Sequence, residues 1–335
     1  MMALWPLPAV FLGALLITWG LRRYALLRNV LDIPNSRSSH TQPTPRGGGL
    51  AIVLAFSLAL PWASWMGALS MVHLWALVGA GWLVALAGFV DDHLSLGALW
   101  RLLAHFVAAI WALVFLGGAP DLLVLGVAVD LGWIGFALAV LYLVWLLNLY
   151  NFMDGIDGLA GIEALTVGLG AALLYAWLGL WDALLLPVAL ALAAGGFLVW
   201  NFPPARIFMG DAGSGYLGLI IGMLSLQAAL IDPGLLWVWL ILLGVFIVDA
   251  TLTLGRRLAR GERIYEAHRS HAYQHAARHY GRHLPVTLAV AAINIFWLLP
   301  IACWVAQGGE GLAGVFLAYL PLIWLALYFR AGVDG

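Results

Sequence analysis

Residues 131–149 read LGWIGFALAVLYLVWLLNL, a run of nineteen positions without a charged side chain. About 18 such residues are enough for a helix to cross the hydrocarbon core of a bilayer. The run is continuously apolar, whereas a strand of a membrane β-barrel alternates apolar and polar positions. Backbone groups in hydrocarbon must be hydrogen-bonded within the segment, which a helix achieves. The stretch therefore predicts a transmembrane helix.

The composition indicates that such helices make up most of the chain. Of the 335 residues, 64% are hydrophobic and only 9% are charged, against roughly 25% charged residues in a soluble globular protein. The single cysteine, Cys303, excludes an intrachain disulfide and a cysteine-based metal site. We expect an all-α polytopic membrane protein, a bundle of about 10–11 transmembrane helices that forms one integral-membrane domain over residues 1–335. The predicted spans are 3–20, 48–67, 72–90, 101–118, 131–149, 159–179, 183–200, 213–230, 235–254, 286–306 and 312–329.

The basic residues predict the orientation of these spans. The chain has fifteen arginines and no lysine. If the spans alternate in direction, every arginine falls on one side, and the opposite loops carry acidic residues such as Asp121 and Asp232. The positive-inside rule then predicts that the N-terminus lies outside and that the arginine-bearing loops face the cytoplasm. The arginines are Arg22, Arg23, Arg28, Arg37 and Arg46, then Arg101, Arg206, those from Arg256 to Arg282, and Arg330.

Four polar clusters interrupt the arginine-bearing ends of the spans. Ionisable residues at membrane depth are costly and are candidates for a functional site. The first cluster, FVDDHLSL at 89–96, contains Asp91 and Asp92. This pair is either a solvated stop at the membrane surface or a site for a cation-linked phosphate, in which one carboxylate serves as a base.

The second cluster, NLYNFMDGIDGLAG at 148–161, carries a polar side chain at every third position. Positions i and i+3 are neighbours on a helix, so Asn148, Asn151 and Asp154 are expected to form one polar stripe, with Asp157 beyond it. A stripe that only joins helices would more often use Ser or Thr. Carboxylate and amide oxygens instead suit Mg²⁺, which takes one or two protein oxygens together with substrate phosphates.

The third cluster, NFPPARIFMGDAGSG at 201–215, contains Asn201, Arg206 and Asp211. Asp211 lies between glycines at the predicted start of a span, where free backbone N–H groups can bind an anion. A Gly-Asp-x-Gly motif alone is also common in simple turns. It supports a functional site here because three other polar clusters are predicted on the same side of the membrane.

The fourth cluster, HRSHAYQH at 268–275, combines histidine and arginine donors that suit a diphosphate. Its candidate ligands are His268, Arg269 and His271. Histidines also recur every four residues from His271 onwards, and this pattern fits one face of an interfacial helix. We favour that simpler interpretation for the last three members of the series, His275, His279 and His283.

The clusters, preceded by DIPNSRSSHTQPTPRGGG at 32–49, follow the order found in one known family. Over about residues 32–275 the chain resembles the polyprenyl-phosphate N-acetylhexosamine-1-phosphate transferases of glycosyltransferase family 4, which include the peptidoglycan lipid-I synthase. The resemblance implies a helical bundle in the bacterial inner (cytoplasmic) membrane, with its active site in a cleft that faces the cytoplasm. It implies transfer of a sugar 1-phosphate from a UDP-N-acetylhexosamine to undecaprenyl phosphate, with release of UMP and with Mg²⁺ (or Mn²⁺) as cofactor. The catalytic loops would be 22–47, 91–100, 148–160, 201–214 and 255–285.

The resemblance also implies roles for individual residues. Two would ligate the metal ion, namely Asp211 and Asn151. Four carboxylates would be catalytic: Asp91 and Asp92 beside the lipid phosphate, and Asp154 and Asp157 in the nucleotide-sugar pocket. Phe208 would stack on uracil. The other nucleotide-sugar contacts would be Asn148, Asn201, His268, Arg269 and His271, and the lipid phosphate or neighbouring loops would contact Arg46 and Arg101.

Two departures from the family pattern narrow the prediction. The last loop reads His268-Arg269-Ser270-His271, where lipid-I synthases carry consecutive histidines. It therefore looks more like the branch that initiates O-antigen and similar surface glycans, which use UDP-N-acetylglucosamine or UDP-N-acetylfucosamine. The second departure is His105, four residues after Arg101, where many relatives have glutamine.

Other functions stay open on the sequence alone. A UDP-MurNAc-pentapeptide phosphotransferase is one, and a polytopic transporter with a cytoplasmic cation site is another, although transporter sites usually lie near the midplane of the membrane. A CDP-alcohol phosphotransferase is excluded. The motif of that family would begin with Asp154-x-x-Asp157-Gly158, but it requires Ala-Arg where this chain has Gly161-Ile162. The reaction is either direct attack by the lipid phosphate or passage through a covalent aspartyl phosphate. The expected partners are undecaprenyl phosphate, the UDP-N-acetylhexosamine and membrane lipid, and no nucleic acid is expected. The sequence leaves open whether the chain forms a homodimer.

Overall fold

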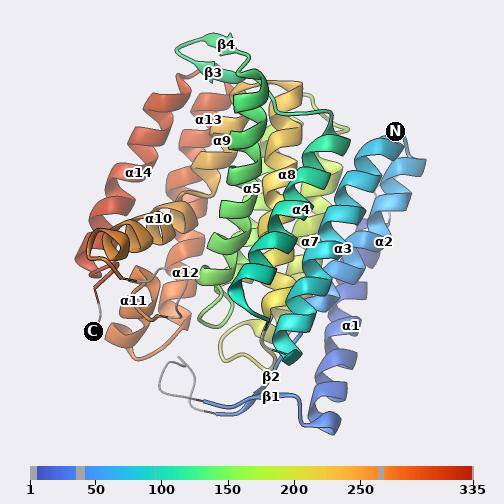
Figure 1. Cartoon of the computed structure of the whole chain (residues 1–335), viewed down its shortest axis with the longest axis vertical. Helices are drawn as coiled ribbons and strands as arrows, with labels where there is room; N and C mark the ends of the chain where they lie inside the picture. Colours follow the sequence, from blue (N-terminus) through green and yellow to red (C-terminus); the bar gives the residue numbers. More distant parts are fainter. Residues whose placement is uncertain (1–5, 35–41, 95, 263–267, 334–335) are drawn as a thin grey trace.

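The computed structural model describes residues 6–34, 42–94, 96–262 and 268–333. Within these residues the chain is a bundle of helices that run side by side, as Figure 1 shows. Some predicted features lie outside the described residues: the start of the span 3–20, parts of the loops 22–47 and 255–285, and Arg37.

Eight helical segments of the described chain are long and apolar enough to cross a membrane, which confirms the prediction of an all-α polytopic membrane protein. Two shorter apolar helices, α2 (Leu50–Trp65) and α7 (Leu185–Asn201), match the predicted spans 48–67 and 183–200. The long segments are α1 (Leu7–Arg28), α3 (Met71–Leu94), α4 (Ala98–Leu116), α5 (Gly132–Met153), α6 (Leu159–Trp177), α8 (Asp211–Ile231), α14 (Gly311–Tyr328) and the segment Leu284–Ala306, which comprises α12 (Leu284–Ile293), the π-helical turn η1 (Asn294–Leu298) and α13 (Leu299–Ala306).

The prediction of one continuous helix over 235–254 is wrong. In its place α9 (Gly234–Leu242) and α10 (Gly244–Ala259) are bent by 75° relative to each other. α10 carries Asp249 and ends in Arg256 and Arg257, and charged side chains of this kind are costly in hydrocarbon. The bend at Leu243 precedes these charged residues, and after α10 the chain continues into the short helix α11 (Ala272–Tyr280).

Two short antiparallel hairpins, which the sequence pattern did not indicate, lie at opposite ends of the bundle (Figure 1). One pairs β3 (Leu122–Val124) with β4 (Val127–Val129) through a two-residue turn whose residues both have positive φ, as hairpin turns require. The other pairs β1 (Leu31–Asp32) with β2 (Thr44–Pro45). The second hairpin matters for function because it delivers Arg46 to the start of α2.

The central helix of the bundle is α8. In its most apolar stretch 83% of the residues are buried, against 22–28% in α1, α4 and α14. Glycine lets α3 lie directly against the start of α8, since a Cβ at Gly88 would be 2.6 Å from the backbone nitrogen of Ala212. The first turn of α8 is therefore held by backbone contact with its neighbour.

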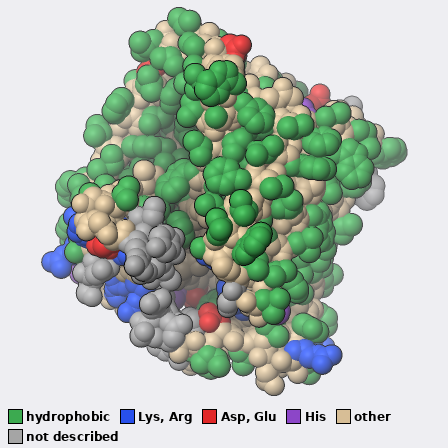
Figure 2. All heavy atoms as spheres, in the orientation of Figure 1, with side chains coloured by type: hydrophobic (Ala, Val, Ile, Leu, Met, Phe, Trp, Pro, Cys, Tyr) green, Lys and Arg blue, Asp and Glu red, His purple; other side chains and the backbone are tan. Residues whose placement is uncertain are grey.

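Charged and apolar side chains separate along the bundle. Figure 2 shows hydrophobic side chains over the flanks, while the visible arginines gather at the lower end. The four polar clusters lie at that same end, where α3, α5 and α7 finish and α8 begins (Figure 1). The alternation of the helices thus brings together segments that are far apart in the sequence.

Candidate active site

Asp92 holds the first residues of α8 in place. Its carboxylate accepts hydrogen bonds from the backbone N–H groups of Asp211 (3.2 Å) and Ala212 (3.5 Å), and a negative charge is favourable at a helix N-terminus. One Nη atom of Arg46 lies 2.6 Å from Asp92 Oδ1 and donates to Asp211 Oδ1 at 3.2 Å. The Asp92 side chain is 5% exposed and that of Asp211 is 25% exposed. Asp92 is therefore an internal anchor, and Asp211 is the carboxylate that faces open space.

Asp91 fixes a second arginine on the other side of Asp211. It accepts a hydrogen bond from the N–H of Leu96 at 2.7 Å and from Arg101 Nη1 at 2.6 Å. The same Arg101 nitrogen is 3.9 Å from Asp211 Oδ2. Asp211 thus lies between two guanidinium groups, those of Arg46 and Arg101.

Asn151 and Asp154 bring the end of α5 to the same place. Ser214 Oγ donates to Asn151 Oδ1 at 2.8 Å and so joins α5 to the first turn of α8. Asp154 lines the same cavity as Asn151 and Asp211. Burial and the negative charge of Asp211 raise the pKa of Asp154 well above its usual value, although Arg46 opposes this. Carboxylates crowded in this way are stabilised by a bound cation.

The donor set is suited to Mg²⁺. Among the described residues, no three His, Cys, Asp or Glu side chains are placed to hold a metal ion on their own. Mg²⁺ does not need such a cage, because proteins usually bind it through one or two carboxylates together with water and substrate phosphates. Asp211, Asp154 and Asn151 offer hard oxygens of this kind around one cavity.

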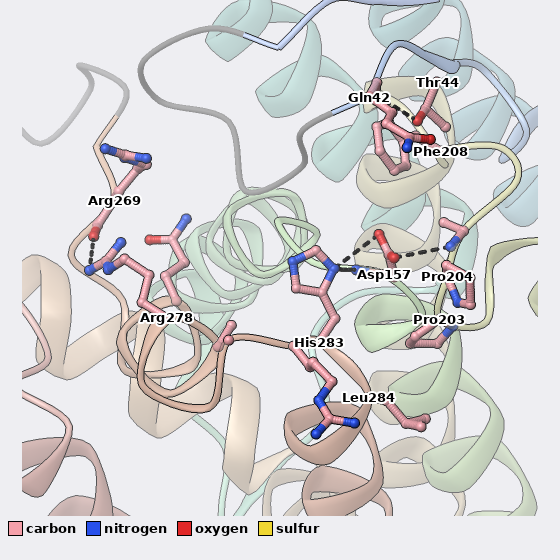
Figure 3. Close-up of a pocket in the computed structure, with 15 residues that line it drawn as sticks. Gln42, Thr44, Asp157, Pro203, Pro204, Phe208, Arg269, Arg278, His283 and Leu284 are labelled. Carbon is pink, nitrogen blue, oxygen red and sulfur yellow. Dashed lines mark hydrogen bonds and ion pairs between the residues drawn. The ribbon is translucent and has the colours of Figure 1, made fainter.

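This polar cavity has a volume of about 260 Å³ and continues into a larger cavity of about 660 Å³. In Figure 3, Phe208 lies on one side of the larger cavity, with Arg269 and Arg278 on the opposite side. Arg278 donates to the backbone carbonyl of Arg269 at 3.1 Å, which holds this basic side together. The residues that line both cavities are Asp157, Phe208, Gln274 and His283.

Asp157 ties three segments together at the junction of these cavities (Figure 3). Its Oδ2 accepts a hydrogen bond from the N–H of Ala205 at 3.0 Å, and its Oδ1 lies 3.2 Å from Nδ1 of His283. Its backbone carbonyl accepts a hydrogen bond from Thr287 Oγ1 at 2.8 Å. The loop after α5, the loop before α8 and the start of α12 therefore share one carboxylate.

A third cavity, of about 400 Å³, lies on the other side of Asp211, between α3, α4, α5 and α8. Most of its lining is apolar, with side chains such as Val84, Leu99 and Leu102. Asp211 and Asn151 line this apolar cavity as well as the polar one. Its other polar lining residues are Asp91, Arg101, His105 and Asn148.

The predicted nucleotide-sugar residues divide into two groups. Asn201, Phe208 and Arg269 line the polar cavities, and Asn201 also joins two loops by accepting from the N–H of Gly158 and donating to the carbonyl of Ile207, both at 2.9 Å. Three others are not among the described residues that line these cavities. Asn148 is turned towards α4, and His268 and His271 stack on each other with ring centroids 4.9 Å apart.

His271 is 2% exposed, and its Nδ1 lies 3.3 Å from Asp249 Oδ1. Asp249 also accepts hydrogen bonds from the N–H groups of Ala272 and Tyr273, both at 2.9 Å, and so anchors the start of α11. Asp249 was not predicted, although a charged residue inside the predicted span 235–254 is a signal of the same kind as the four clusters. No such signal marks His283, which contacts Asp157 only because of the fold.

Comparison with known proteins identifies the family of the chain. The model of glycosyl transferase family 4 matches residues 74–229. The probable undecaprenyl-phosphate N-acetylglucosaminyl 1-phosphate transferase of Bacillus subtilis is 32% identical over 273 residues, which cover 78% of this chain and 74% of the relative. The decaprenyl-phosphate N-acetylglucosaminephosphotransferase of Mycobacterium tuberculosis is 31% identical over 365 aligned positions, with 95% and 89% covered.

A third relative is a phospho-N-acetylmuramoyl-pentapeptide-transferase of Moorella thermoacetica, which is 39% identical over 197 residues, or 53% of this chain and 62% of the relative. The first two similarities extend over most of the chain and over most of each relative, and the matched family model covers the residues from Asp91 to Asp211. The chain therefore belongs to glycosyl transferase family 4 and is one of its polyprenyl-phosphate phosphosugar transferases.

Proposed function

We propose that the chain transfers N-acetylglucosamine 1-phosphate, or the 1-phosphate of a closely similar N-acetylhexosamine, from its UDP derivative to undecaprenyl phosphate and releases UMP. The names of the B. subtilis and M. tuberculosis relatives support N-acetylglucosamine as the sugar and a polyprenyl phosphate as the acceptor. The product would start a surface glycan such as O-antigen. The transporter alternative has no support from the three relatives named above.

One observation carries this proposal: Asp211 and Asn151 form a wall shared by a polar and an apolar cavity. A nucleotide sugar is soluble in water and a polyprenyl phosphate is soluble in lipid, so their reacting groups must meet at such a boundary. The larger cavity, which shares lining residues with the polar one and has Phe208 on one side and Arg269 on the other, suits a uracil ring and phosphates. The apolar cavity suits the first isoprenyl units of the acceptor, with the phosphate near Arg101.

The site would face the cytoplasm of a bacterium, with the N-terminus outside. The support is that the described arginine-bearing loops share one end of the bundle with the site, as the positive-inside rule requires of a cytoplasmic face. UDP-sugars are cytoplasmic metabolites, so the same orientation gives the enzyme access to its donor.

Mg²⁺ would be held by Asp211, Asn151 and Asp154. When bound, the ion would neutralise charge on the diphosphate and on the departing UMP. The protein's own residues would do the rest of the work. Arg46 and Arg101 compensate the carboxylates around Asp211, which lets two anionic substrates approach the same wall.

In the proposed reaction an oxygen of the lipid phosphate attacks the β-phosphorus of the donor. The bond from the β-phosphorus to the bridging oxygen breaks, and that oxygen leaves with UMP. The second pKa of a phosphate monoester is about 6, so most of the acceptor is already fully ionised near neutral pH. A proton that remains on the acceptor would pass to Asp91, which lines the apolar cavity, because Asp92 is held inside the bundle by Arg46 and the start of α8.

Direct attack is favoured over a covalent aspartyl phosphate by the state of the carboxylates. Both oxygens of Asp92 accept hydrogen bonds or pair with Arg46, and both oxygens of Asp91 are similarly engaged, which makes them poor nucleophiles. Incubation of the enzyme with donor alone distinguishes the two routes. Direct attack predicts no UMP without lipid, whereas a covalent route predicts one equivalent of UMP per enzyme.

The decisive experiment combines purified protein, undecaprenyl phosphate and Mg²⁺ with separate UDP-N-acetylhexosamines and with UDP-MurNAc-pentapeptide, and measures UMP. We expect turnover with UDP-N-acetylglucosamine. Exclusive use of UDP-MurNAc-pentapeptide would support the alternative indicated by the Moorella relative. Folded protein that releases no UMP with any donor would overturn the proposal.

A further inference from the structure

His105, in the middle of α4, lines the apolar cavity and has no place in the reaction described above. We infer that His105 is a neutral hydrogen-bond donor that binds the phosphate of the lipid acceptor through Nε2–H. This inference rests on the proposed function, and it assigns the acceptor phosphate a contact that neither arginine provides.

The hydrogen-bond network assigns the protonation of the imidazole ring. Asn148 Nδ2 is 2.7 Å from the backbone carbonyl of Val144, which can only accept, so the amide nitrogen and not the amide oxygen points there. The same Nδ2 is 3.3 Å from Nδ1 of His105. An amide nitrogen only donates, so Nδ1 must accept with its lone pair. The proton of the neutral ring is therefore on Nε2.

This Nε2–H is an unused donor within the described part of the chain. Asn148 is the one hydrogen-bond partner that the described residues give His105, and it takes Nδ1. The charged groups that face the cavity are Asp91 on α3, Arg101 on α4 and Asp211 on α8, while the polar groups that α5 contributes are two uncharged amides. Since Arg101 is already paired with Asp91 at 2.6 Å, the acceptor phosphate meets a partly compensated arginine and a free histidine donor.

The surroundings of His105 favour a lipid phosphate over a soluble anion. The remaining lining of the cavity is made largely of aliphatic side chains, including Val84, Ala87, Leu99, Leu102 and Leu147. An apolar chain that ends in a phosphate could pack on these aliphatic side chains and place its phosphate beside His105 and Arg101. A neutral donor also orients the phosphate. A second full positive charge would strongly stabilise the attacking oxygen before the reaction, and this would oppose the attack.

The test compares His105→Leu with His105→Gln. Leucine cannot donate, and we expect the KM for undecaprenyl phosphate to rise about tenfold, the effect of losing a hydrogen bond to a charged group, with the KM for the UDP-sugar unchanged. Glutamine can accept from Asn148 through its oxygen and donate through its nitrogen. We therefore expect His105→Gln to return the lipid KM to within about threefold of the wild type.

His73→Leu is a matched control. His73 is paired with the amide of Gln227 at 3.2 Å, as His105 is with Asn148, but it lies near the opposite end of α3 from Asp91. This variant should leave both KM values unchanged, which separates loss of a phosphate donor from general loss of a histidine–amide contact. Size-exclusion profiles and melting temperatures check that each variant is folded.

The outcomes separate this inference from the proposed function. Absence of UMP release by the wild type overturns the function and the inference together. Normal turnover by the wild type, with an unchanged lipid KM in His105→Leu, overturns the inference alone. An equal rise in both KM values, or failure of His105→Gln to restore the lipid KM, also overturns it, because each indicates a purely structural role.

Discussion

The Asp157 carboxylate lies 3.2 Å from Nδ1 of His283, a residue 126 positions further along the chain. The contact joins the loop after α5 to the start of α12 at the junction of the two polar cavities. Asp157 occupies one of the predicted polar clusters, whereas His283 belongs to a periodic series that reads as one face of a helix. The contact shows how the fold adds a residue to the site.

A His283→Ala substitution tests this contact. The backbone N–H of Asp157 donates to His283 Nδ1 at 3.3 Å and would lose this acceptor. The loop after α5 would then be held less firmly, so we expect the KM for the UDP-sugar to rise about tenfold with little effect on the lipid KM. His279→Ala is the control, since His279 packs on Tyr280 and Phe329 away from the cavities. Steady-state measurements with each substrate varied in turn give the result. Equal behaviour of the two variants would show that the Asp157–His283 pair is not part of donor binding.

Asp211→Asn removes one negative charge from the wall shared by the polar and apolar cavities. We expect kcat to fall at least about 100-fold, as is typical when one group that stabilises transferred charge is lost. Asn151→Ala should also lower kcat, because it removes the amide oxygen of Asn151 from the proposed metal site. Asp232→Asn, just past the other end of α8, should be nearly silent. Retained Mg²⁺-dependent activity in both site variants contradicts the proposed metal site.

Metal affinity should depend on pH through Asp154. Its pKa is raised, first by burial and then by Asp211, so this carboxyl keeps its proton to higher pH than an ordinary aspartate. A metal ion binds the deprotonated form, and affinity must therefore increase with pH and fall by about tenfold per unit below the pKa in the folded protein. Binding of Mn²⁺ to the substrate-free enzyme, followed by EPR, measures this slope. Asp154→Asn should flatten it, and an unchanged slope in that variant would exclude Asp154 as the titrating group.

The close approach of α3 to α8 predicts a strong effect of Gly88→Ala. The added Cβ would lie 2.6 Å from the backbone of Asp211 and Ala212, so the first turn of α8 must move. A displacement of about 1 Å in a catalytic group can reduce turnover about 100-fold. The comparison is Gly20→Ala in α1, where nothing lies within 4 Å of the new Cβ. We expect near-normal turnover and melting temperature from Gly20→Ala, and a similar turnover from both variants would argue against the contact.

The sequence by itself determined the membrane class, the positions of most helices and the four polar clusters. These follow from local physical chemistry: long apolar runs must be helical in lipid, and charged side chains are excluded from it. The same reasoning placed the four clusters on one side of the membrane, whereas a common cleft for their carboxylates was implied by the family resemblance. The structure brings Asp91, Asn151, Asp154 and Asp211 to the cavities at one end of the bundle, with Asp92 bound to the start of α8. The break at Leu243 escaped prediction because hydropathy measures composition and not direction.

Only the tertiary structure decided how the polar residues divide between tasks. Asp92 anchors α8 and Asp211 faces the cavities, although both are aspartates at the end of a span. Asn148 turns towards His105 while Asn151, three residues later, turns towards Ser214. His271 is buried against Asp249, and His283 reaches Asp157. Hydropathy and spacing fix which face of a helix is polar, but the partner that this face meets depends on helix packing, and packing is set by contacts between residues far apart in the chain.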